Sequence, residues 1–153
     1  IEQLCSAAKN MGQDSIAITD HGVMYGCVEF YKAAKKVGIK PIIGCEVYVA
    51  PRSRFDKIKE FDSEMYHLVL LCKNETGYKN LIKLVSLSFT EGFYFKPRVD
   101  IEILEKHSQG LIALSACLAG EIPRALLANN YDIAKQSALK YQNIFGIAGP
   151  NII

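Results

Sequence analysis

Apolar residues recur at two different spacings along this chain, and each spacing predicts its own kind of element. A spacing of three and four residues is typical of amphipathic helices, and it is found over 1–11, 24–37, 75–89, 120–128 and 131–145. Nearly continuous apolar runs, typical of buried strands, occupy 15–19, 39–50, 65–73 and 111–114. A short helix is also expected over 99–106. Strands that alternate with helices of this length predict an α/β fold with mostly parallel strands, arranged as a layer or a barrel.

Three of the four predicted strands carry a side chain that can bind a metal ion. Asp20 and His21 directly follow the first strand, Glu46 lies inside the second, and His67 opens the third. Burying a lone carboxylate costs several kcal/mol, so we expect Glu46 to be paired, protonated or bound to a cation. Because polar groups gather where parallel strands end, the recurrence predicts that these side chains share one site.

Each of these residues also has a structural interpretation that the sequence leaves open. Asp20 can cap a helix, His21 can be a surface residue, and Glu46 can lie on an exposed strand face. A lone histidine such as His67 is more often held by hydrogen bonds in the core. Cys117 is a fifth candidate, because it lies at the tip of a predicted strand and not within a helix.

The candidate residues define a class of chemistry. Carboxylate, imidazole and thiolate groups together suit zinc, manganese or iron, and they do not suit calcium. A metal ion held by such groups activates water and binds phosphate esters, so phosphoester hydrolysis is the reaction class that we predict. The sequence contains no glycine-rich phosphate loop, no GxSxG motif and no dinucleotide-binding fingerprint, which weakens the case for a nucleotide-dependent transferase or a serine hydrolase.

Composition places the chain among globular proteins. Half of its 153 residues are hydrophobic and 22% are charged, which suits a single domain with a real core. The net charge of +2 is too small to indicate nucleic-acid binding, and the charged stretch 51–63 is expected to be a mobile or disordered loop. Five scattered cysteines without CxxC spacing are expected to be reduced thiols, which predicts a cytoplasmic protein. No run approaches the roughly 18 apolar residues of a membrane span, so no membrane partner is expected.

Several segments, taken in order, resemble the polymerase-and-histidinol-phosphatase (PHP) domain family, in the branch found at the N-terminus of bacterial replicative DNA polymerase III alpha subunits. These segments are ITDHG, the Gly-Cys-Glu of PIIGCEVYVAPRSR, YHLVLL, NETGYKNLIKLVS, EGFYFKPR and LIALSACLAGEIPR. ITDHG is shared across the wider superfamily, whereas the later segments are specific to the polymerase branch.

The resemblance implies a distorted (β/α)7 barrel, similar to a TIM barrel, that holds up to three metal ions at its strand ends. It places His21, Glu46 and His67 at metal-ligand positions, and Cys117 where some members have a ligand. Asp20 takes a position that can brace the loop without contacting the metal. The implied metal is zinc, with manganese or iron as alternatives, and the implied activity is that of a 3′–5′ exonuclease or phosphoesterase.

The same resemblance implies a larger context. The full-length proteins of this branch are DNA-directed DNA polymerases, nucleotidyltransferases that use magnesium in a separate domain and replicate DNA together with other replisome subunits. In some members the metal site is degenerate, and the domain is then structural or docks a separate proofreading exonuclease.

The resemblance is incomplete at both ends of the chain. The family opens with a strand that bears His-x-His, which is not found here, and 147–153 does not resemble the family. We therefore expect a partial PHP domain over 1–146, a non-matching tail over 147–153, and weak or absent catalysis. An incomplete barrel exposes sheet edges, so self-association of the chain is expected. A stand-alone PHP-family phosphatase and a non-catalytic structural or interaction module stay open as alternatives.

Overall fold

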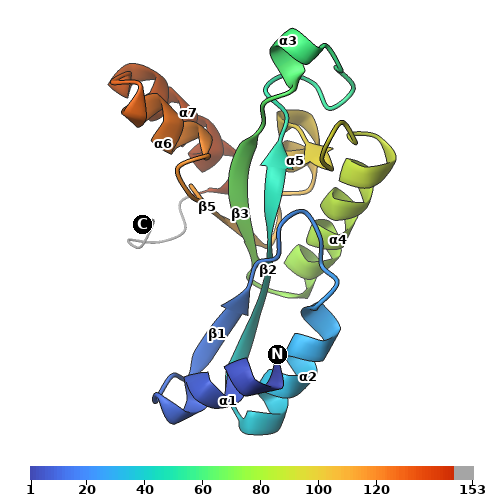
Figure 1. Ribbon diagram of the computed structural model, residues 1–153, viewed down its shortest axis with the longest axis vertical. Coiled ribbons are helices and arrows are strands. Elements are labelled where there is room, and N and C mark those ends of the chain that lie inside the picture. The colour runs from blue at the N-terminus through green and yellow to red at the C-terminus, as the bar shows by residue number, and fades with distance from the viewer. Residues whose placement is uncertain (147–153) are drawn as a thin grey trace.

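A computed structural model describes residues 1–146 as a mixed five-stranded sheet with helices packed against it (Figure 1). The tail predicted over 147–153 lies outside the described residues. In chain order the elements are α1 (Glu2–Asn10), β1 (Ser15–Ile18), α2 (Cys27–Val37), β2 (Lys40–Val49), α3 (Lys59–Asp62), β3 (Tyr66–Cys72), α4 (Glu75–Thr90), β4 (Arg98–Val99), α5 (Ile101–Lys106), β5 (Leu111–Leu114), α6 (Glu121–Leu127) and α7 (Tyr131–Phe145). The predicted helices and strands are all present, and the short elements α3 and β4 are additions.

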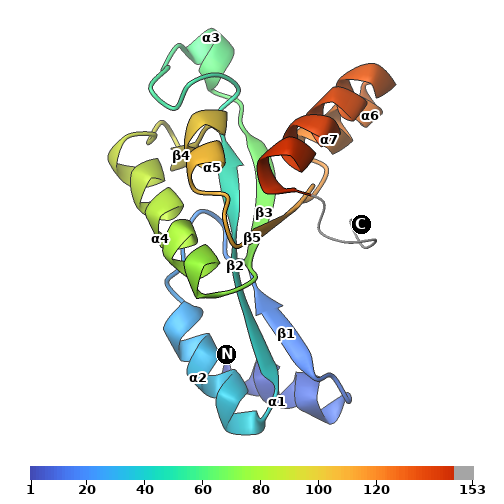
Figure 2. The same cartoon turned by 180° about the vertical axis from the view of Figure 1, so that it is seen from behind.

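The long strand β2 is the centre of the sheet. Its first half pairs with β1 in parallel, from Lys40 to Ile43, and its second half pairs with β3 in antiparallel orientation, from Gly44 to Val49. The strand order is β1-β2-β3-β5, and β4 pairs with the end of β2. Figures 1 and 2 show β2 running through both halves of an elongated molecule.

The prediction of an α/β fold is confirmed, whereas the prediction of mostly parallel strands is wrong. β3 runs antiparallel to both of its neighbours, β2 and β5. The reason lies in the connection between β2 and β3, which contains only the four-residue helix α3. Within this connection, no helix carries the chain back along the sheet to the start of β2. Tyr66, the first residue of β3, instead pairs with Val49, the last residue of β2, so the chain turns back alongside β2. Within residues 1–146, β1 and β5 are the outer strands of the main order, the two-residue β4 is a further edge, and the sheet stays open instead of closing into a barrel.

The molecule has two halves, and each half has its own hydrophobic cluster. One contains Phe30 and lies among α1, β1, α2 and the start of β2. The other is larger, contains Leu70 and joins one face of β2 and β3 to α4, α5 and α7. Because residues alternate between the two faces of a strand, the second face of β2 is left to carry Glu46 and Tyr48.

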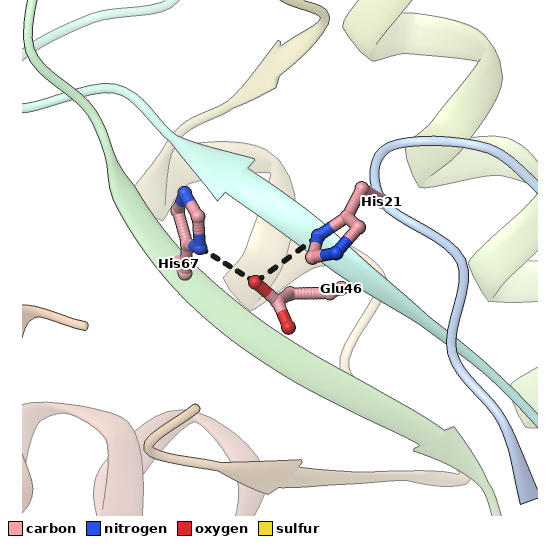
Figure 3. A group of neighbouring side chains, drawn as sticks. All are labelled: His21, Glu46 and His67. Atoms are coloured by element: carbon pink, nitrogen blue, oxygen red, sulfur yellow. Dashed lines mark ion pairs between the residues drawn. The ribbon is translucent and has the colours of Figure 1, made fainter. Parts of the chain in front are cut away.

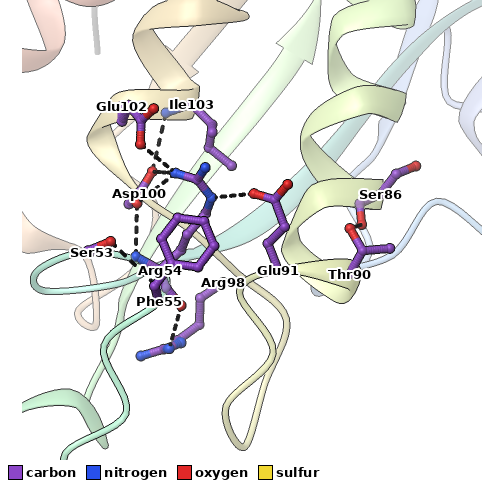
Figure 4. A network of polar contacts seen from close by, with 10 residues as sticks. All are labelled: Ser53, Arg54, Phe55, Ser86, Thr90, Glu91, Arg98, Asp100, Glu102 and Ile103. Atoms are coloured by element: carbon purple, nitrogen blue, oxygen red, sulfur yellow. Dashed lines mark hydrogen bonds and ion pairs between the residues drawn. The ribbon is translucent and has the colours of Figure 1, made fainter.

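Buried arginines fix the connection between β2 and β3 (Figure 4). The Arg54 guanidinium pairs with Asp100, Glu91 and Glu102 at N···O distances of 2.7 to 3.0 Å. Arg98 is fully buried and donates hydrogen bonds to four backbone carbonyls, three of them in the connection: Asp62, Arg54, Asp56 and Gly92. The expectation of a mobile or disordered loop over 51–63 is therefore wrong, since these ion pairs and hydrogen bonds tie it to β4 and α5.

None of the helices in residues 1–146 combines the length and the hydropathy needed to cross a membrane.

Candidate metal centre

The turn after β1 is attached to the middle of β2 by backbone hydrogen bonds. Glu46 N–H donates to the Asp20 carbonyl at 3.0 Å, and Gly22 N–H donates to the Glu46 carbonyl at 2.9 Å. These bonds continue the parallel register of β1 and β2 beyond the strand end and set His21 beside Glu46. Gly22 adopts a left-handed conformation with φ of 70°, which a glycine takes without steric cost. The apolar strand and the polar turn of ITDHG thus act as one unit that delivers His21.

His67 reaches the same place from the opposite direction. It is the second residue of β3 and lies directly across from Tyr48 on β2, on the same face of the sheet as Glu46. Diagonal neighbours in an antiparallel pair are close enough for long side chains to touch. The antiparallel direction of β3 is what brings the beginning of this strand to the site, since a parallel β3 would carry His67 to the other end of β2.

The three side chains converge on one point (Figure 3). Glu46 Oε1 lies 3.3 Å from His21 Nδ1 and 2.5 Å from His67 Nδ1. One potential ligand atom from each residue lies within 4.8 Å of the other two. The His21 side chain is 67% exposed, whereas those of Glu46 and His67 are 12% and 22% exposed. The group is therefore buried on one side and open to solvent through His21.

The donor set fits a divalent metal ion. Among the described residues, Glu46 Oε1 is the one buried side-chain oxygen or nitrogen without a hydrogen-bond partner, because neither imidazole contact has hydrogen-bond geometry. A buried carboxylate oxygen without a donor is costly, and a cation would satisfy it. Two imidazoles and one carboxylate are also the protein ligands of many catalytic zinc sites, which keep a further position for water or substrate.

Asp20 and Cys117 lie outside this group of three. Asp20 Oδ2 lies 3.3 Å from the position that a Cβ of Gly26 would occupy, at the start of α2. Burial, and then the nearby Asp20 carboxylate, raise the pKa of Cys27 in α2, which places that carboxylate beside the helix. Cys117 is exposed, and its Sγ lies 3.4 Å from His67 Nδ1. Cys117 is thus a neighbour of His67, while the ligand roles of all five residues stay predictions.

Tyr48 is a further residue of the site that the sequence interpretation overlooked. Its ring meets the His67 ring edge to face, with centroids 5.2 Å apart, and the Lys96 ammonium lies 5.8 Å from its centroid. Burial, followed by the charge of Glu46, raises the pKa of Tyr48. The period-two alternation of a strand was the available signal, because Tyr48 follows Glu46 by two residues and so shares its face.

Comparison with known proteins assigns the chain to a family. The family model for the PHP domain matches residues 1–149. The chain therefore belongs to the PHP domain family, as its sequence motifs predicted.

Its relatives within the family are replication proteins. DNA polymerase III subunit alpha of Borreliella burgdorferi is 52% identical over 147 residues, which are 95% of this chain and 13% of that protein. The subunit of Chlamydia trachomatis is 56% identical over 132 residues, or 86% of this chain and 11% of the relative. The chain is thus similar to a PHP segment of DNA polymerase III alpha subunits and spans about an eighth of the length of the relative from Borreliella burgdorferi.

Among solved structures, a protein from Bifidobacterium adolescentis that is named as a metal-dependent phosphoesterase superposes with a TM-score of 0.39. It is 17% identical, and the match covers 57% of this chain and 27% of that one. A likeness at this level carries no argument about the fold or the site.

Proposed function

We propose that this chain is the PHP segment of a bacterial replicative DNA polymerase III alpha subunit and that His21, Glu46 and His67 bind a divalent metal ion in it. Zinc is the metal that we propose first, with manganese or iron as alternatives that the same ligands accept. The observation that carries the metal site is the buried Glu46 oxygen, which faces two imidazoles and has no hydrogen-bond donor.

The arrangement supports phosphoester hydrolysis. A zinc ion in such a site lowers the pKa of a bound water and polarises a phosphoryl oxygen. Glu46 supplies the negative charge from the buried side, and His21 is exposed, so a ligand from solvent approaches on the side of His21. His67 stands on the strand opposite Glu46, where Cys117 is a candidate for an additional ligand. Asp20 is proposed to brace the turn through its carbonyl, which accepts hydrogen bonds from Glu46 N–H and Cys45 Sγ.

The wider role follows from similarity to the relatives and is likewise a proposal. The complete protein would be a DNA-directed DNA polymerase of the cytoplasm that acts on DNA with other replisome subunits and uses magnesium in its polymerase domain. A separate proofreading exonuclease subunit is a further candidate partner. We propose residues 1–146 as the PHP part of this chain. We also propose that the chain self-associates in solution through the outer strands β1 and β5, since unpaired strand edges pair with one another.

The test begins with metal content. The purified 153-residue chain is incubated with zinc, dialysed and analysed by plasma mass spectrometry, with His21→Ala and Glu46→Ala variants beside it. We expect about one zinc per chain in the wild type and a clear loss in both variants, because the described residues offer one group of three ligands. Equal zinc content in all three proteins would contradict the site.

The second step separates the functional alternatives. Hydrolysis of bis(p-nitrophenyl) phosphate and removal of 3′ nucleotides from single-stranded DNA are measured with and without zinc. We expect weak hydrolysis that disappears in the variants. A non-catalytic module would instead lose thermal stability in the variants without any hydrolysis to lose. Reading the gene on both sides of this segment tests the polymerase branch, because a stand-alone phosphatase would not continue to the length of the polymerase relatives.

A further inference from the structure

We propose that Tyr48 is a positioning residue that sets the spacing of the two histidines in the metal site. This inference rests on the proposed metal site and adds a residue that binds no metal itself. The Tyr48 ring lies against the ring of His67 and beside the backbone of Gly22, the residue that follows His21. It is therefore in contact with both of the elements that bring the histidines to Glu46.

The contact with His67 fixes the orientation of an imidazole ring. Tyr48 and His67 are register partners of the antiparallel pair, so their Cβ atoms lie on the same face and close together. The two rings meet at 79° with centroids 5.2 Å apart, an arrangement that aromatic rings favour. Because the His67 side chain is only 22% exposed, removing the tyrosine ring would leave open space beside the imidazole and let it turn away from Glu46.

The contact with Gly22 limits how closely the other histidine approaches. A Cβ built on Gly22 would lie 2.9 Å from Tyr48 Cε2, which is closer than real Cβ atoms come, and 3.1 Å from Pro97 Cγ, which is tighter than most Cβ contacts. The backbone of the turn therefore lies so near the tyrosine ring that no side chain fits between them. The ring acts as a stop, and the hydrogen bonds of the turn to Glu46 hold the backbone against it.

The combined effect is on geometry and not on charge. The centroids of the His21 and His67 rings are 6.2 Å apart, and Tyr48 lies against the parts of the chain that carry both rings. Zinc ligands must stay near fixed distances and directions, and residues that only orient ligands commonly change metal affinity by about 10- to 100-fold. Tyr48→Leu should therefore weaken zinc binding at least tenfold, whereas Tyr48→Phe, which keeps the ring, should bind zinc as the wild type does.

The experiment is a zinc titration of the 153-residue chain in competition with a chromophoric chelator. Tyr66→Leu is the matched control, because Tyr66 precedes His67 on the same strand and lies on the other face, where it packs against Arg124. Thermal melting in the absence of metal verifies that each variant is folded. In the metal-free chain, NMR shifts of the His67 ring protons report the ring contact itself, and we expect them to change in Tyr48→Leu and to be kept in Tyr48→Phe.

A second variant approaches the same contact from the turn. Gly22→Ala should weaken zinc binding for two reasons, because its methyl group meets the ring and because φ of 70° is strained for alanine. The part that is due to the ring should be lost when Tyr48→Leu is already present. Equal zinc affinities of Tyr48→Leu and the wild type would overturn the role of Tyr48. Failure of the wild type to bind zinc would overturn the proposed metal site instead, so the two ideas fail by different results.

Discussion

Replacing Glu46 by glutamine should have opposite effects on stability and on metal binding. The substitution keeps the shape of the side chain and removes its negative charge. The Glu46 side chain is 12% exposed, and its Oε1 has no hydrogen-bond donor. Leaving a buried polar group unsatisfied costs about 1–3 kcal/mol, and more for a charged group. The metal-free Gln variant should therefore be at least as stable as the wild type, with a melting temperature higher by about 2–4 °C for each kcal/mol gained.

In the presence of zinc, the wild type should instead be more stable than the Glu46→Gln variant. A ligand present at 100 times its dissociation constant stabilises the folded state by about 2.7 kcal/mol when it does not bind the unfolded chain. The wild type should show this gain, while the Gln variant, which lacks the anionic ligand, should show little of it. A residue selected for folding alone would not produce such a reversal.

The assay is urea unfolding in the presence of EDTA and again in the presence of excess zinc. Glu121→Gln is the matched control, because Glu121 is also largely buried, with 16% of its side chain exposed. Its carboxylate is fully partnered, since it accepts hydrogen bonds from Ser137, Lys140 and Tyr141. The control should be destabilised in both conditions and should keep the gain from zinc. A metal-free Glu46→Gln variant less stable than the wild type by more than about 1 kcal/mol would refute the reasoning.

Three further predictions concern the packing and the ionisable groups around the site. Arg98→Met should destabilise the chain by about 3 kcal/mol or more in urea unfolding, because four carbonyl groups lose a fully buried donor; a loss below 1 kcal/mol would contradict this. Hydrogen bonds from Arg52 hold the pKa of Asp62 below its ordinary value of 3.8, so this stabilisation is complete above that value and is lost as the pH falls through the lowered pKa. The urea concentration at the unfolding midpoint should therefore fall less steeply in Asp62→Asn than in the wild type between about pH 5 and 3, the range in which carboxyl groups titrate. An equal slope in the two proteins would contradict this prediction. At pH 8, mass spectrometry should find Cys117 alkylated first, because it is exposed, and Cys45 last, because burial raises its pKa to about 12; the reverse order would be inconsistent with the structure.

The sequence was sufficient to find the candidate ligands because each one lies within an apolar run or close to one end of it. Glu46 and His67 are conspicuous among β-branched and aliphatic neighbours, and the structure brings both of them to His21. The direction of β3 could not be predicted in the same way. Strand direction depends on the connection before the strand, and the local pattern of β3 is the same in a parallel and an antiparallel pair. The two histidines were thus expected to meet for a reason, parallel strand ends, that does not apply to His67.

The local sequence also could not predict that the connection between β2 and β3 is well ordered. Arg54 reads as one charge in a mixed, irregular stretch, and its partner Asp100 lies 46 residues further along the chain. Contacts at such separations are made by tertiary packing, and no spacing rule along the chain reports them. The pairing of Tyr48 with His67 was hidden in the same way, although the position of Tyr48 on the face of Glu46 was accessible from strand periodicity.

The division of the ligands between the two hydrophobic clusters has a thermodynamic consequence. His21 follows β1, whose Ile16 and Ile18 pack against the cluster around Phe30. Glu46 and His67 lie on β2 and β3, which carry the cluster around Leu70 on their other face. A cation bound by all three side chains would link the two halves, which share the strand β2. Transient opening of the smaller half would remove His21 from the cation. Occupancy of the metal site and protection of α1 and α2 from hydrogen exchange would then rise and fall together. A substitution that weakens the packing around Phe30 would therefore lower the affinity of the site for the cation.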